Sequence, residues 1–157
     1  MSDELTAWHE AGHAIMAAAL GGSVRRVSIY SEDEEQAGST AVEWRGGYST
    51  SKEHAMREIR VSLAGPVAEM IYAGEYDSLR VQSAHALDWE IAMAHTRAIT
   101  QNPEKQHRLL QDIVNELYHF LRDDNVHAAL GDLADQLLTH DEVEAESVAQ
   151  IARQWLR

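Results

Sequence analysis

The sequence contains no cysteine, only two prolines and a single phenylalanine among its 157 residues. Without cysteine the chain can form neither a disulfide framework nor a thiolate metal site, so any metal ligands must be His, Asp or Glu. The scarcity of proline and a hydrophobic fraction of 45% favour a folded, helix-rich protein. A chain of this length is expected to form a single domain, residues 1–157, with a proper core.

Positive charge is also scarce, with 13 Lys and Arg against 26 Asp and Glu and a formal net charge of −13. This balance disfavours nucleic acid or an anionic membrane as a partner, because both would be repelled. The apolar run at residues 14–20 is too short to span a membrane and has no basic leader before it. We therefore expect no membrane span and a cytoplasmic location.

One short motif, His9-Glu10-Ala11-Gly12-His13, indicates chemistry. Residues four apart lie on the same face of a helix, so His9 and His13 can turn their imidazoles towards one metal ion. Glu10 sits one step round the helix, where a general base is needed to take a proton from a zinc-bound water.

The sequence around this motif predicts a helix that begins after Ser2 and ends at Gly21-Gly22. Ser2 suits the N-cap, acidic residues follow it in the first turn, and residues 14–20 are rich in helix formers. The same pattern on a surface helix would give two solvated histidines. The small apolar neighbours favour a buried helix instead, where an unpaired histidine is costly.

The rest of the chain predicts a small β element and further helices, a mainly α (α+β) fold. Strands are expected at residues 24–30 and 39–44, with a turn at 31–38 between them. An edge of this element either adds an extended peptide as a further strand or is simply covered. Further helices are expected from residue 50 to about 71, with a kink or a restart at Gly65-Pro66, and at 83–100, 103–122, 124–138 and 144–156.

Two imidazoles need a third protein ligand, which leaves a fourth position for water. Three candidates are Glu69, on the second long helix, and His85 and Asp88, one turn apart on the next. Spacing does not choose among them. Five other histidines, outside the predicted helix at 83–100, have no ligand-spaced partner and are expected to be surface or structural residues. They are His54, His107, His119, His127 and His140.

Four segments, in the same order, resemble the zinc peptidase domain of the FtsH-type ATP-dependent proteases, and together they extend over almost the whole chain. They are residues 8–15 around the motif, Leu-Ala-Gly-Pro-Val-Ala-Glu at 63–69, Asp-Trp-Glu-Ile-Ala at 88–92 with Arg97, and residues 133–138 with Glu146 and Val148. The resemblance implies a helical zinc-peptidase fold with the small β element beside the motif helix. It also implies that Asp88 is the third zinc ligand.

The chain departs from the pattern of that family at three points. Pro66 stands where the family usually has Arg, and Leu87 where it has a polar residue, usually Asn. The loop ahead of Asp88 is longer, so a stricter count would place His85 at the ligand position, whereas Ala92 and Arg97 align with Asp88 without a gap. A phosphate-binding GxxxxGK[ST] motif is absent from the sequence, so the ATPase of the family is not expected in this chain.

These patterns predict a zinc-dependent metallopeptidase that cleaves flexible or unfolded polypeptides without ATP. His9, His13 and Asp88 are the expected Zn²⁺ ligands and Glu10 the catalytic residue. Two alternatives stay open: a non-catalytic peptide- or partner-binding module on the same fold, and a zinc hydrolase of a non-peptide amide. The expected partners are a peptide or unfolded protein substrate, a second copy of the chain, or a separate ATPase.

Overall fold

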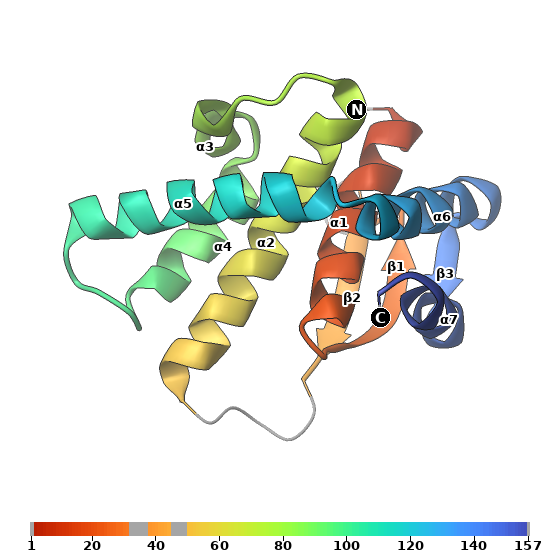
Figure 1. The fold of residues 1–157 in the computed structure, drawn as a ribbon, viewed down its shortest axis with the longest axis horizontal. Coiled ribbons are helices and arrows are strands. Elements are labelled where there is room, and N and C mark those ends of the chain that lie inside the picture. Colours follow the sequence, from red (N-terminus) through yellow and green to blue (C-terminus); the bar gives the residue numbers. More distant parts are fainter. Residues whose placement is uncertain (1, 32–37, 45–49, 157) are drawn as a thin grey trace.

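A computed structural model describes residues 2–31, 38–44 and 50–156, which form a mainly helical protein with a small three-stranded sheet (Figure 1). The expected mainly α (α+β) class is confirmed. The helices are α1 (Asp3–Ala19), α2 (Ser51–Ala73), α3 (Val81–Ala84), α4 (Ala86–Thr96), α5 (Pro103–Leu121), α6 (Asp124–His140) and α7 (Ala145–Trp155), with a 3₁₀ turn at Ser78–Arg80 before α3. The strands are β1 (Ser23–Ser28), β2 (Ser39–Glu43) and β3 (Glu142–Glu144).

Helix α1 is central to the fold and begins where the sequence predicts. The Ser2 hydroxyl accepts a hydrogen bond from the Leu5 amide at 3.2 Å, and the chain leaves the helix through Gly21, whose φ of 87° favours glycine. Helix α2 packs along α1, as Figure 1 shows. A Cβ added at Gly12 would overlap the backbone of Ala64 on α2, so glycine is required for this close approach.

Helix α2 begins as predicted but is not interrupted. The Thr50 hydroxyl accepts a hydrogen bond from the Glu53 amide at 3.0 Å, and Gly74, with a φ of 71°, closes the far end. The helix does not restart at Gly65-Pro66, because it runs through both residues to Ala73. The lost hydrogen bond and steric clash of a mid-helix proline cost about 3 kcal/mol, and burial of this segment against α1 offsets that cost.

The sheet has the strand order β2-β1-β3 and is antiparallel throughout. Both predicted strands are confirmed with shorter bounds, and the predicted turn at 31–38 lies largely outside the described residues. Strand β3 was not predicted, because its three residues pair with β1 only through tertiary contact. In the described part of the chain β2 pairs with β1 alone, so it forms one edge of the sheet.

The single helix predicted at 83–100 is wrong. The chain breaks at His85, whose φ of −133° and ψ of 56° are not helical, and this residue separates α3 from α4. The His85 carbonyl still accepts the Trp89 amide at 3.0 Å, so His85 serves as the N-cap residue of α4. Trp89 and Ala92 are buried and anchor α4 against the core.

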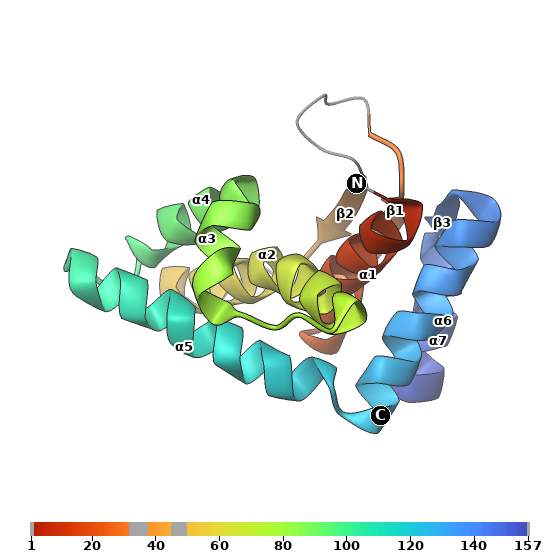
Figure 2. The ribbon, with the colours of Figure 1, turned by 90° about the horizontal axis from the view of Figure 1, so that it is seen from above.

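Helices α5 and α6 enclose the central pair from two sides. Seen from above, α5 packs against α2 and α4, whereas α6 and α7 lie on the other side of α1 (Figure 2). Their inward faces are leucine-rich, with Leu110, Leu117, Leu121, Leu130, Leu133 and Leu137 all buried. None of the helices in the described ranges combines the length and apolar character that a membrane crossing requires.

Candidate metal centre

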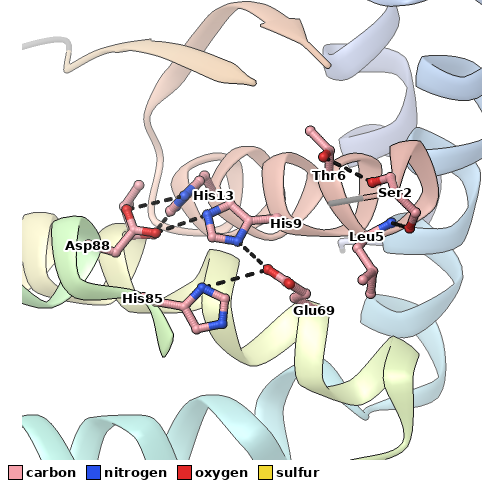
Figure 3. Close-up of polar contacts among 9 residues, drawn as sticks. Ser2, Leu5, Thr6, His9, His13, Glu69, His85 and Asp88 are labelled. Atoms are coloured by element: carbon pink, nitrogen blue, oxygen red, sulfur yellow. Dashed lines mark hydrogen bonds and ion pairs between the residues drawn. The ribbon is translucent and has the colours of Figure 1, made fainter. Parts of the chain in front are cut away.

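The three predicted ligands meet where α1 faces α4. The Nε2 atom of His9 lies 2.9 Å from Asp88 Oδ2, and the Nε2 atom of His13 lies 3.6 Å from Asp88 Oδ1. Figure 3 shows both imidazoles turned towards this one carboxylate. All three side chains are largely buried, with exposed fractions of 12% for each histidine and 18% for Asp88.

The opposite ring nitrogens are fixed by hydrogen bonds. His13 Nδ1 donates to the carbonyl of Val61 at 2.6 Å, and His9 Nδ1 donates to Glu69 Oε2 at 2.8 Å. A carbonyl can only accept, so Nδ1 of His13 carries hydrogen and its neutral ring has the lone pair on Nε2. Histidines that bind metals typically donate their other N–H to a carboxylate or backbone carbonyl in this way. The arrangement therefore suits metal binding through both Nε2 atoms.

The position of His13 depends on a glycine in α2. A Cβ added at Gly65 would overlap the His13 ring, so this ring lies directly against the backbone of α2. Residues 63–69, one of the segments that resemble the peptidase family, thus contribute the backbone contact with His13 at Gly65 as well as the Glu69 carboxylate. This close packing limits the conformations open to the imidazole.

The charges at this centre indicate a place for a cation. Burial alone would lower the pKa of His9, but its hydrogen bonds with Asp88 and Glu69 outweigh burial and raise that pKa to about 10. Burial alone would raise the pKa of Asp88, but its bond with His9 and the nearby imidazoles lower that pKa below its usual value. Without a metal, a protonated His9 therefore lies between two carboxylates. A divalent cation can replace that proton.

Glu69 and His85, the other candidates for the third ligand, lie behind His9. Glu69 contacts the Nδ1 side of His9, and its Oε2 atom is 3.7 Å from Nδ1 of His85. Burial lowers the pKa of His85 and favours its neutral form. Asp88 is the candidate that faces the Nε2 atoms of both motif histidines, so the geometry favours Asp88 as the third ligand.

Potential metal-binding groups in the described residues all share His9. One comprises His9, Glu10 and His13, and another His9, Glu69 and His85; within each, the ligand atoms lie within 4.8 Å of one another. The second group is the direct alternative to an Asp88 site. None of the five histidines expected to be structural belongs to either group.

Glu10 is buried, with 6% of its surface exposed, and strand β2 holds its carboxylate. The Thr40 hydroxyl donates to Glu10 Oε1 at 2.7 Å. Gly38 passes so close that an added Cβ would lie 2.7 Å from Glu10 Cγ. Sequence reasoning missed Thr40 and Val61, because no local pattern links either residue to the motif. Only the tertiary fold brings them to it.

A cleft with a volume of about 580 Å³ opens over this centre. It is lined by the motif residues, by Gly38, Thr40 and Val42 from the β2 segment, and by residues of α2, α3 and α4. The candidate ligands and Glu10 are therefore accessible to a substrate lying between β2 and α4.

We expect zinc binding at about pH 8 to release a proton from His9. Below its pKa of about 10 His9 is protonated in the metal-free protein, and a ligand must be neutral, so zinc affinity should rise with pH by up to tenfold per unit. Calorimetric titration in buffers of different ionisation enthalpy counts the protons released. Glu69→Gln removes one of the carboxylates that raise this pKa, so its proton release should decline at a lower pH than that of the wild-type protein. The same pH dependence of proton release in both proteins would contradict this.

Three of the four segments that resemble the FtsH-type peptidase domain contribute to this centre. Residues 8–15 supply both histidines and Glu10, residues 63–69 supply Gly65 and Glu69, and residues 88–92 supply Asp88. The fourth segment lies in α6 and α7, which support α1 from its other side. Comparison of the chain with models of known protein families found no match, and comparison with curated proteins found none either.

Proposed function

We propose that this protein is a zinc-dependent metallopeptidase acting on extended, flexible polypeptides. The observation that supports this most strongly is the convergence of His9 Nε2 and His13 Nε2 on the Asp88 carboxylate, with both Nδ1 atoms already hydrogen-bonded. The buried Glu10 carboxylate beside them supplies the group that hydrolysis needs.

The donors present fit zinc. Two imidazole nitrogens and one carboxylate, His9, His13 and Asp88, are a ligand set that zinc accepts, and three protein ligands leave one position open. When bound there, zinc supplies a water of lowered pKa and polarises a substrate carbonyl. Glu69 and Val61 keep the imidazoles oriented through their Nδ1 atoms.

Glu10 acts as the proton carrier. Its Oε1 atom accepts the hydrogen bond from Thr40, which fixes the plane of the carboxylate within the cleft. The carboxylate accepts a proton from the attacking water and passes it to the departing amide nitrogen, so that the amine leaves neutral. A base held in place by a neighbouring strand loses little entropy on reaching the transition state.

Strand β2 provides a binding edge for the substrate. Within the described residues no second strand pairs with the side of β2 that faces away from β1. The β2 segment also lines the cleft beside Glu10. An extended peptide can add to such an edge through backbone hydrogen bonds, which bind without regard to sequence. A flexible or unfolded chain can take up this extended conformation without first breaking its own tertiary contacts, so such chains are the substrates that this edge favours.

A cleavage assay with an unfolded, casein-like chain tests this proposal. Purified protein should hold about one zinc and cut the unfolded chain, lose cleavage with a chelator, and regain it on addition of one equivalent of zinc. Addition of ATP should leave the rate unchanged. Bound zinc without any cleavage would indicate a binding module, and cleavage confined to small amides would indicate a different hydrolase.

A further inference from the structure

Glu58 lines the same cleft as the metal centre but has no part in the proposed chemistry. Its Oε1 atom accepts a hydrogen bond from the Trp44 indole nitrogen at 2.7 Å. The Arg57 guanidinium lies over the Trp44 ring, 5.6 Å from the ring centroid. Glu58 is thus held at a defined place in the cleft by a neutral donor.

The distance of Glu58 from the metal centre can be estimated along two elements, α2 and the β2 segment. Glu58 precedes Gly65, which contacts His13, by two turns of α2, or about 10 Å at 1.5 Å per residue. Its partner Trp44 follows Thr40, which contacts Glu10, by about 13 Å at 3.3 Å per residue of extended chain. These spacings place Glu58 about three to four residues of extended peptide away from the metal centre.

The cleft is negatively charged, and Glu58 is the acid of its lining that has neither a histidine partner nor a part in the proposed chemistry. Its described lining includes the carboxylates of Glu10, Glu58, Glu69 and Asp88 and no Lys or Arg. Glu69 and Asp88 are engaged with His9, and zinc would neutralise the centre further. The Glu58 carboxylate forms no ion pair among residues 2–31, 38–44 and 50–156. A cationic ligand could therefore form a charged hydrogen bond with it.

We propose that Glu58 forms a subsite for a lysine or arginine side chain of the substrate, about three to four residues from the bond that is cut. This inference rests on the proposed peptidase function. Val42 and Val61 line the cleft between Glu58 and the metal centre and suit the aliphatic stem of such a side chain. The Glu58 carboxylate then pairs with the ammonium or guanidinium group.

Sequencing of the cleavage products of a randomised peptide library tests this subsite. The wild-type protein should favour Lys or Arg at one fixed position near the cut by roughly 5–20-fold in kcat/KM, the range for a partly exposed charged hydrogen bond. Glu58→Gln should remove most of that preference, and Glu58→Lys should shift it towards Asp and Glu. The control Glu146→Gln removes the same charge from an exposed position on α7, where Glu146 lies 3.0 Å from Arg153, and should keep the preference.

A binding measurement separates this inference from the peptidase function. In zinc-loaded Glu10→Gln protein, fluorescence anisotropy should show weaker binding when a lysine at that position of a labelled peptide is replaced by glutamine, and Glu58→Gln should abolish the difference. Cleavage without any basic preference that depends on Glu58 would overturn the subsite alone. Basic-selective binding without cleavage in the wild-type protein would overturn the peptidase function and leave the subsite standing. Absence of both would overturn both.

Discussion

Alanine in place of Asp88 is expected to empty the zinc site. Structural zinc sites with four ligands bind with about 10–16 kcal/mol, or roughly 3 kcal/mol for each ligand, so losing one should weaken binding by more than about 100-fold. Asp88 is also the residue that faces both Nε2 atoms, so its loss removes the point where the two imidazoles converge. Zinc per chain, measured after dialysis against a competing chelator, should fall to near zero.

Two control variants make this result specific. Glu90→Ala removes an exposed acid from the same helix and should keep full zinc content. His85→Ala removes a side chain that contacts Glu69 behind the ligands, and such changes typically weaken metal affinity by about 10–100-fold. If His85→Ala emptied the site and Asp88→Ala did not, His85 would be the third ligand.

Glutamine in place of Glu10 is expected to keep zinc and lose catalysis. The amide oxygen can still accept the Thr40 hydrogen bond, so the local structure should persist, but an amide cannot take up a proton. General acid–base groups contribute about 10²–10⁴-fold, and kcat/KM for an unfolded chain should fall by that factor. Metal content and initial cleavage rates measured on the same preparation give both results.

A loss of zinc from Glu10→Gln protein would contradict this assignment. It would make Glu10 a ligand in the group that it forms with His9 and His13. Thr40 supplies a graded control: Thr40→Val should lower kcat/KM by a smaller factor than Glu10→Gln, because only the orientation of the carboxylate is lost. Thr40→Ser keeps the hydroxyl and should restore most of the rate.

Features that depend on neighbouring residues could be predicted from the sequence. Ser2 and Thr50 cap their helices through amides three residues ahead, and Gly74 ends α2 in a conformation that glycine favours. The motif histidines share a face of α1 because four residues make about one turn. Each of these depends on a few consecutive residues, so the fold class and the starts of α1 and α2 followed from the sequence.

Features that depend on distant contacts could not be predicted in this way. The break at His85 and the unbroken helix through Pro66 are set by packing that local propensity does not report. Val61 and Thr40 contact the motif across 48 and 30 residues of sequence, and neither residue type indicates such a role. The placement of Asp88 was inferred only through a family resemblance, because spacing alone allowed His85 and Glu69 as well.

Whether His9, His13 and Asp88 together hold a zinc ion can be seen in a crystal structure with zinc, from data measured at the zinc absorption edge. We expect a single anomalous peak about 2.0–2.2 Å from both Nε2 atoms and from an Asp88 carboxylate oxygen. A peak between Glu69 and His85, or no peak in crystals soaked with zinc, would contradict it.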